Sequence, residues 1–273
     1  MSDHDEVKYT DEFVTKLELV FGTGFLSPGG IEEVAKIVEG IDFKDKVVLD
    51  IGVGVAGPAC LLVENHGANH VTGIDLEKPV LQKAAKTVAA RNLDDHITLK
   101  HVKPGALPFD DASFDMVFSK DSIIHVPDKP ALFKEALRVL KPGGWVVMSD
   151  WCCGDEPPTR EMQDWLASNG LGFVMTPISK GEALLGDAGF ADYAVLDRNE
   201  WFAGFSKALF ERMSGPEYAA MVSVLGQEEA DNWLGRTETW SVLSKQGQIR
   251  SGHLRGRTGM VMRKGIGTLF WRS

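Results

Sequence analysis

Closely spaced glycines follow an acidic residue in the first quarter of the chain. The apolar run Val47–Ile51 contains Asp50 near its end, and Gly52, Gly54 and Gly57 follow directly. Because glycine has no Cβ atom, such residues allow a tight turn and a close approach of the backbone to a ligand. The pattern predicts a strand, a ligand-binding loop and the start of a helix.

A second acidic residue narrows the class of ligand. Asp75 ends the segment Val71–Asp75, about twenty residues after the glycine loop, where one carboxylate can accept both hydroxyls of a nucleoside ribose. Ala56 stands in place of the third glycine of the dinucleotide pattern. The shorter loop favours S-adenosylmethionine (SAM), which has no pyrophosphate, over NAD. The predicted cofactor is therefore SAM, bound by Asp75 and by the loop that follows Asp50.

These residues need a parallel sheet to position them. Strands alternate with helices from Lys46 to Trp151, a pattern typical of a parallel sheet with helices on both faces. The predicted strands lie near 46–51, 70–75, 96–102, 114–119 and 144–150, and the predicted helices near 57–66, 78–91 and 129–139. Further on, the pattern predicts helices at 158–169 and 198–246, a strand at 190–197 and a closing strand near 258–263.

The predicted fold is a doubly wound, Rossmann-like α/β fold with a mostly parallel seven-stranded sheet. Residues 1–40 are expected to form an N-terminal helical lid, and residues 41–151 the SAM-binding core. Residues 152–273 are expected to supply a helical substrate cap and the closing strands of the same domain. No internal repeat or low-complexity linker separates these parts.

Composition excludes several other classes of protein. The net charge of −10 argues against general nucleic-acid binding and against binding to an anionic membrane surface. No apolar run is long enough to span a membrane, and the first residues do not form a signal peptide. Three cysteines with an adjacent pair, Cys152 and Cys153, favour a reducing cytoplasm over a disulfide framework. The histidines match no metal spacing, so no metal site is predicted.

Several motifs taken together resemble the class I SAM-dependent methyltransferases. They cover roughly residues 45–150 and are, in order, Asp50–Gly57, Asp75, Asp110–Asp115, Ser119–His125 and Leu137–Gly144. The resemblance assigns to the cofactor, besides the acids and glycines above, Leu76, Val102, Lys103 and Ser119. Lys103 departs from the pattern, because many relatives have an acid there, near the adenine amino group.

The N-terminal segment narrows the resemblance. Tyr9–Glu12, Phe21-Gly22 and Ser27–Gly30 are similar to the lid of phosphoethanolamine N-methyltransferases. Ser119–His125 is similar to a segment of those enzymes and of the sarcosine/dimethylglycine methyltransferases. The resemblance implies that Tyr9 and His125 form a dyad that closes over the amine. It also implies that Leu26 and Ser27 contact the cofactor.

The chain departs from this resemblance at the positions that hold the substrate phosphate in the phosphobase enzymes. Tyrosines and basic residues are expected there, and a phosphate dianion needs several fixed donors and cations. This chain instead has Leu17, Trp165, Asn169, Leu171 and Leu243. Phosphoethanolamine is therefore a poor match as substrate.

Methyl transfer to an amine assigns roles to a few further residues. An alkylamine must lose its proton before attack, and a histidine such as His125 can serve as base or proton relay. Asp121 lies four residues earlier, on the same side if this segment is helical, where it can orient the imidazole or hold an ammonium group. Trp151 and Trp165 are candidate substrate contacts, since aromatic rings attract methylated ammonium groups by cation–π interaction.

The sequence thus predicts a SAM-dependent methyltransferase that N-methylates a small amine or amino acid, of the glycine-betaine or phosphobase type. Its expected partner is a small-molecule acceptor, with no nucleic acid and no membrane. Two alternatives stay open. The acceptor atom can be sulfur or oxygen, or the chain can bind SAM without turnover. The oligomeric state is not predicted.

Overall fold

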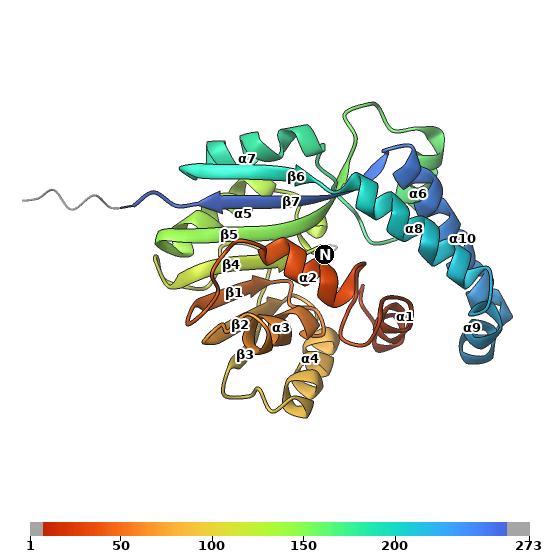
Figure 1. The fold of residues 1–273 in the computed structure, drawn as a ribbon, viewed down its shortest axis with the longest axis horizontal. Coiled ribbons are helices and arrows are strands. Elements are labelled where there is room, and N and C mark those ends of the chain that lie inside the picture. The colour runs from red at the N-terminus through yellow and green to blue at the C-terminus, as the bar shows by residue number, and fades with distance from the viewer. Residues whose placement is uncertain (1–7, 261–273) are drawn as a thin grey trace, which may run out of the picture.

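Seven strands form one sheet at the centre of the computed structural model, which describes residues 8–260 (Figure 1). The order is β3-β2-β1-β4-β5-β7-β6, and only β7 is antiparallel to its neighbours. The predicted α/β fold is therefore confirmed. The strands are β1 (Val47–Ile51), β2 (His70–Asp75), β3 (Ile97–His101), β4 (Phe114–Lys120), β5 (Leu140–Cys153), β6 (Asp192–Asp197) and β7 (Ile249–Arg257).

Helices cover both faces of this sheet, and others extend beyond one end of its strands (Figure 1). Those packed on the sheet are α2 (Gly30–Val38), α3 (Gly57–Glu64), α4 (Lys78–Ala90), α5 (Lys129–Val139) and α7 (Gly181–Ala188). The other helices come from the segments predicted as lid and cap, and they are α1 (Asp11–Phe21), α6 (Arg160–Ser168), α8 (Asn199–Met213), α9 (Tyr218–Leu225) and α10 (Gln227–Lys245). Two short 3-10 helices, η1 (Ile123–His125) and η2 (Ile178–Lys180), complete the described elements.

The side chains of each central strand point alternately to two separate cores. In β1, Val48 packs with residues of α2, α3 and α4, whereas Leu49 packs with residues of α5 and α7. Both side chains are fully buried, as expected for a parallel strand with helices on each face. The continuous apolar sequence of β1 follows directly from this arrangement.

A third core joins the lid to the cap at the carboxyl edge of the sheet. Leu17 of α1 packs there with Trp151 of β5 and with Trp233 and Trp240 of α10. In Figure 1 the cap helices α6, α8, α9 and α10 lie together at the end of the sheet, next to α1. Loops after parallel strands also open at this edge, so the lid and cap cover the place where ligands bind in such folds.

Side-chain caps begin the helices that carry or flank the predicted site. Thr10 accepts a hydrogen bond from the amide of Phe13 at the start of α1. Asp128 caps α5 in the same way, and Thr159 caps α6 through the amide of Met162. Each cap satisfies an amide that the helix leaves without a partner. The lid helix thus begins directly after Tyr9.

Two predicted elements beyond residue 190 were wrong in their extent. The closing strand is Ile249–Arg257, not a strand near 258–263; residues 261–263 lie outside the described residues. Gly252 and Gly256 weaken its sequence signal, yet both are needed because Ile178 and Phe190 fill the space of their missing side chains. The predicted helix 198–246 is three helices, and Gly226, with φ +83°, separates the last two.

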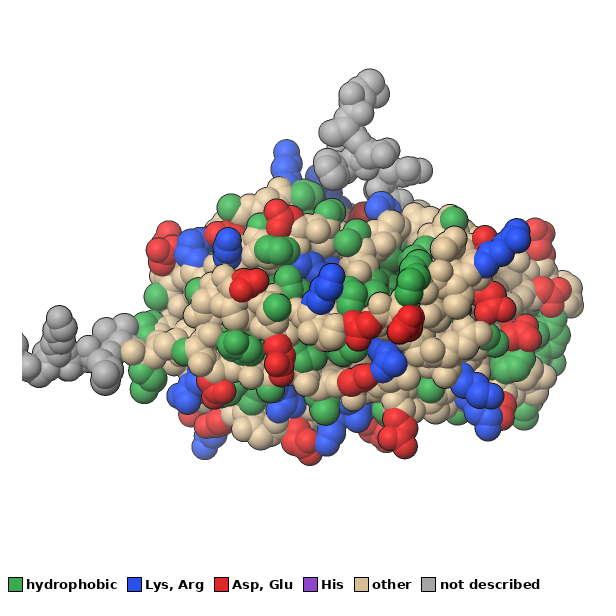
Figure 2. Space-filling view, turned by 90° about the horizontal axis from the view of Figure 1, so that it is seen from above, with side chains coloured by type: hydrophobic (Ala, Val, Ile, Leu, Met, Phe, Trp, Pro, Cys, Tyr) green, Lys and Arg blue, Asp and Glu red, His purple; other side chains and the backbone are tan. Residues whose placement is uncertain are grey.

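Neither sign of charge dominates the face of the molecule drawn in Figure 2. Acidic and basic side chains are interspersed over the face drawn in Figure 2. Within residues 8–260, no helix combines the length and apolar character that a membrane crossing requires.

Candidate active site

The glycine loop after β1 is tightly held against neighbouring segments. Gly52 and Gly54 have φ angles of +73° and +56°, which a side chain would strain. A Cβ atom on Gly52 would lie 1.9 Å from the hydroxyl oxygen of Ser122. Asp75, at the end of β2, accepts hydrogen bonds from the amide of Gly54 at 3.1 Å and from the amide of Glu77 at 3.0 Å. The loop therefore lies beside the carboxylate that the sequence assigns to the ribose.

Asp50 has a property that fits a cationic ligand. Its side chain is 1% exposed, and its Oδ2 atom has no hydrogen-bond partner among the described residues. Burial, aided by the nearby charge of Asp75, raises the pKa of Asp50 to about 8. An unpartnered carboxylate oxygen next to a glycine loop suits a ligand with cationic or N–H groups. The residues present therefore fit SAM, which carries a sulfonium and an ammonium.

The other predicted cofactor residues gather around the same loop, although their roles differ. The Leu26 side chain packs over Gly54, and the amide of Val102 donates to the backbone oxygen of Asp75 at 3.0 Å. Leu76 follows Asp75 and is 48% exposed, and the Lys103 side chain is exposed. Ser119 is fully buried, and its hydroxyl donates to the carbonyl of Ile51 at 2.7 Å. The Ser119 side chain thus joins β4 to β1.

Tyr9 and His125, far apart in sequence, meet in the structure. The hydroxyl of Tyr9 lies 3.0 Å from Nε2 of His125, and Nδ1 of His125 lies 3.3 Å from the carbonyl oxygen of Leu171. The carbonyl can only accept, so Nδ1 carries the proton and Nε2 accepts from Tyr9. Burial lowers the pKa of His125 to about 4 and raises that of Tyr9. The pair is therefore neutral at pH 7.

Asp121 lies close to this pair but does not contact the imidazole. Its carboxylate accepts from Lys120 Nζ at 2.9 Å and from the hydroxyl of Ser149 at 2.8 Å. The predicted orientation of His125 by Asp121 is therefore wrong, since both ring nitrogens bond elsewhere. The reason is local: Asp121 is left-handed, with φ +54°, and only Ile123–His125 are helical, so the expected helical spacing is not formed. The other predicted role, holding an ammonium group, stays a prediction.

Lys120 connects this region to the lid. Its ammonium group donates to the hydroxyl of Ser27 at 2.6 Å and to the carbonyl of Pro28 at 2.8 Å. The Lys120 and Asp121 side chains are 3% and 6% exposed, so the pair is almost fully removed from water. A buried ion pair of this kind needs such additional hydrogen bonds to offset its desolvation. The lid loop is thereby fastened to the end of β4.

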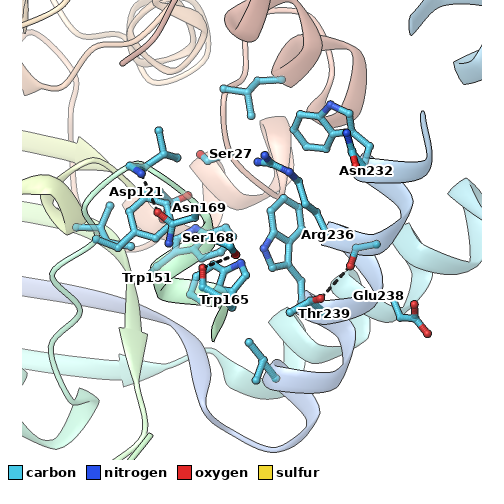
Figure 3. A pocket seen from close by; sticks show the side chains of 18 of the residues that line it. Ser27, Asp121, Trp151, Trp165, Ser168, Asn169, Asn232, Arg236, Glu238 and Thr239 are labelled. Carbon is cyan, nitrogen blue, oxygen red and sulfur yellow. Dashed lines mark hydrogen bonds between the residues drawn. The ribbon is translucent and has the colours of Figure 1, made fainter. Parts of the chain in front are cut away.

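A cavity of about 870 Å³ opens between the lid, the strand ends and the cap (Figure 3). Tyr9, His125 and Asp121 line it together with the two predicted substrate residues, Trp151 and Trp165. The ring centroids of Trp151 and Trp165 are 6.3 Å apart and nearly parallel. The five positions at which the phosphobase enzymes are expected to hold phosphate also line it, namely Leu17, Trp165, Asn169, Leu171 and Leu243. The cavity therefore has no cationic side chain at the five positions where the phosphobase enzymes are expected to hold phosphate.

Several residues of the cavity wall received no site role from the sequence. Phe173 packs on His125 with ring centroids 5.2 Å apart, and Trp240 meets Trp151 edge to face at 5.6 Å. Arg236 and Trp233 also line the cavity from α10. The helical spacing of Trp233, Arg236 and Trp240 would have placed them on one face, but nothing in the sequence shows which way that face points.

Comparison with known proteins agrees with this geometry. The methyltransferase domain family matches residues 49–148. Phosphoethanolamine N-methyltransferase 1 of Arabidopsis thaliana is 32% identical over 232 residues, covering 85% of this chain and 46% of that protein. Phosphoethanolamine N-methyltransferase 2 of Caenorhabditis elegans is 32% identical over 251 residues, covering 84% of this chain and 55% of that protein. The predicted family resemblance is confirmed, and the chain spans about half the length of these curated relatives.

Solved structures show the same fold over nearly the whole chain. Phosphoethanolamine N-methyltransferase 2 of Haemonchus contortus, in complex with phosphomonomethylethanolamine and S-adenosylhomocysteine, superposes with a TM-score of 0.86 at 24% identity. The match covers 94% of this chain and 60% of that one. A candidate sarcosine dimethylglycine methyltransferase of Galdieria sulphuraria has a TM-score of 0.77 at 20% identity, covering 93% of this chain and all of that one. The lid and cap thus belong to the shared architecture as well as the core.

Proposed function

We propose that this chain is a SAM-dependent methyltransferase that transfers a methyl group to the nitrogen of a small amine or amino acid. The observation that carries the proposal is the Tyr9–His125 pair, which lines one cavity together with Ser27 and Asp121. The relatives that match the chain are phosphoethanolamine N-methyltransferases. Domain roles follow the same division, with a lid before residue 41, a SAM-binding core to residue 151 and a substrate cap beyond it.

The cofactor site is proposed at the ends of β1 and β2. Bound SAM supplies a methyl group on a positively charged sulfur, ready for in-line displacement. Asp75 would hold the ribose hydroxyls, and Asp50 would accept from the ammonium group. The glycine loop supplies backbone amides and room for close approach. Leu26, Ser27, Leu76, Val102, Lys103 and Ser119 complete the proposed cofactor set.

Removal of the amine proton falls to the Tyr9–His125 pair. The hydroxyl of Tyr9 can accept the proton of the amine while it passes its own to Nε2 of His125, as the 3.0 Å contact allows. Because burial lowers the pKa of His125 to about 4, the imidazole holds this proton only transiently and loses it to water when the lid opens. Closure of the lid excludes water and aligns the amine with the methyl group.

Two alternatives, SAM binding without turnover and transfer to sulfur or oxygen, differ from this proposal in what they require of the Tyr9–His125 pair. A protein that only binds SAM needs no proton relay beside the methyl group. A sulfur or oxygen acceptor leaves the cofactor site unchanged, because the fold does not determine the acceptor atom. The predicted cytoplasmic location and the exclusion of nucleic-acid substrates stay predictions.

Release of S-adenosylhomocysteine by the purified chain tests the proposal. Glycine, sarcosine, dimethylglycine, phosphoethanolamine and thioether acids form the panel of acceptors. Turnover on an amine series supports N-methylation. Turnover only on the thioether acids would show that the acceptor atom is sulfur. S-Adenosylhomocysteine binding without turnover on any acceptor contradicts the amine assignment, and no binding contradicts the cofactor assignment.

A further inference from the structure

Three residues with nitrogen donors line the cavity from one face of α10. Trp233, Arg236 and Trp240 are spaced by three and four residues, so they lie above one another along the helix, and all three line the cavity. The guanidinium carbon of Arg236 lies 5.4 Å from the Trp233 ring, and the Trp233 and Trp240 rings are 6.4 Å apart. Figure 3 shows Arg236 on the opposite side of the pocket from Asp121 and Asn169.

These donors are buried and lack acceptors. Trp233 is 1% exposed and Trp240 is 8% exposed, and the indole Nε1 of each has no hydrogen-bond partner among residues 8–260. Nδ2 of Asn169, across the cavity, is unpartnered in the same way. Buried N–H groups in native proteins are nearly always paired, so unpaired ones that line a cavity point to a ligand with acceptor oxygens.

The charges of the cavity wall distinguish between kinds of anionic group. Arg236 is the one lysine or arginine among the residues that line the cavity, and within the described chain no carboxylate lies in salt-bridge range of it. Glu161, Asp164 and Glu238 line the exposed side. One guanidinium matches a monoanionic carboxylate, whereas a phosphate dianion would face three carboxylates with a single cation.

The opposite wall suits a cation. Trp151, Trp165 and Asp121, whose carboxylate is paired with Lys120 at 2.9 Å, line it, and aromatic rings attract ammonium groups. In the phosphobase enzymes a lysine is expected at the position of Leu243. Arg236 lies two turns before this position on the same face of α10, a distance of about 10 Å along the helix. A ligand that reaches Arg236 differs from a phosphobase in both the charge and the position of its anionic end.

We propose that the acceptor substrate is a zwitterion, an amine whose carboxylate binds the donors of Trp233, Arg236 and Trp240 while its nitrogen faces Asp121 and Tyr9. This inference rests on the proposed function and names its substrate class. The three α10 residues are specificity determinants that contact the substrate away from the reacting nitrogen. The chain thus distinguishes amino acids from phosphobases through α10.

Quaternary ammonium probes test the anion preference directly, since their positive charge does not depend on pH. Choline, glycine betaine, 4-(trimethylammonio)butanoate and phosphocholine share one cationic head and differ only in the other end. Tryptophan fluorescence can follow their binding to the full chain, with and without S-adenosylhomocysteine. We expect at least one carboxylate probe to bind tenfold or more tightly than choline and phosphocholine. Equal affinities, a phosphocholine preference or no binding of either carboxylate probe would overturn the proposal.

Variants assign that preference to α10. Arg236→Ala should weaken the carboxylate probe about tenfold and change choline binding by less than twofold, because a charged hydrogen bond is lost only for the carboxylate. Trp240→Phe keeps an aromatic side chain, although a smaller one, and removes the N–H, so a smaller loss, confined again to the carboxylate probe, is expected. Arg91→Ala removes an arginine that pairs with Glu64 away from the cavity and serves as the matched control.

The results also separate this inference from the proposed function. Tight carboxylate binding that Arg236→Ala leaves unchanged would overturn the assignment to α10, even if S-adenosylhomocysteine still binds. Loss of S-adenosylhomocysteine binding in the unaltered chain would overturn the proposed function but would leave the probe preference measurable. A fold-change equal for all four probes in Arg236→Ala would indicate a structural role for the residue.

Discussion

The two ends of the candidate active site are built in different ways. The cofactor end comes from successive strand–loop–helix units, so that Asp50, the glycine loop and Asp75 lie within one short stretch of sequence. The acceptor cavity combines α1, the end of β5, α6 and α10, which are far apart in sequence. The cofactor end depends on backbone geometry and buried carboxylates, whereas the acceptor end depends on side-chain identity. A fold can therefore keep one cofactor while its substrate changes.

The largest expected effect is a loss of turnover, from a change at the boundary between the cofactor end and the acceptor end. His125→Ala should lower kcat by about 10²–10⁴, because it removes the proton relay but leaves the glycine loop intact. S-Adenosylhomocysteine release measures turnover, and titration with the same compound measures cofactor binding. His66→Ala, just after the end of α3 and not among the residues that line the cavity, is the control. Turnover within about threefold of the unaltered chain, with cofactor still bound, would show that His125 is not catalytic.

A second variant should affect the cofactor end alone. Asp75→Ala should weaken S-adenosylhomocysteine binding by about 10- to 100-fold, since it removes hydrogen bonds between a carboxylate and the ribose. It also removes the acceptor of the Gly54 amide. Calorimetric titration gives the affinity, and Asp94→Ala, at an exposed carboxylate, controls for the change in charge. Unchanged affinity would reject the ribose assignment.

The acceptor end should respond to the loss of an aromatic face. Trp151→Leu should raise KM about 3- to 30-fold for methylated amines and less for primary amines, as expected for a cation–π contact of about 0.5–2 kcal/mol. The initial rates of S-adenosylhomocysteine release across an amine series give this comparison. Trp201→Leu alters a cap tryptophan that does not line the cavity. An equal rise in KM for all amines would mean that Trp151 only packs.

The smallest expected signal is a fraction of a proton released from Asp50. Because burial raises its pKa to about 8, Asp50 is mostly protonated at pH 7 before the cofactor binds. A cationic ligand favours the ionised form, so binding should release a proton, and affinity should rise with pH up to about 8. Calorimetry with SAM in buffers of different ionisation enthalpy measures this release. Asp50→Asn should abolish it, and proton release that persists in Asp50→Asn would place the titrating group elsewhere.

The difference between the two ends also explains how far the sequence analysis reached. The four strands from Val47 to Lys120 and the helix 129–139 were predicted closely, because apolar runs, glycines and prolines signal such elements locally. The fifth strand, Leu140–Cys153, is longer at both ends than the predicted strand near 144–150. The closing strand was placed too late, because two glycines that pack against Ile178 and Phe190 weaken its strand signal. Asp121 was expected beside the imidazole, but a left-handed backbone turned its carboxylate to Lys120 and Ser149.

The sequence by itself determined the fold class, the glycine loop and the two acids of the cofactor site, because each depends on contacts between neighbours in the chain. It also identified Tyr9 and His125 through a family resemblance. Only the tertiary structure decided that α10 turns Trp233, Arg236 and Trp240 into the cavity, and that both ring nitrogens of His125 are already bonded. Those facts depend on how distant helices pack across the carboxyl edge of the sheet, and side-chain spacing within one helix does not specify that packing.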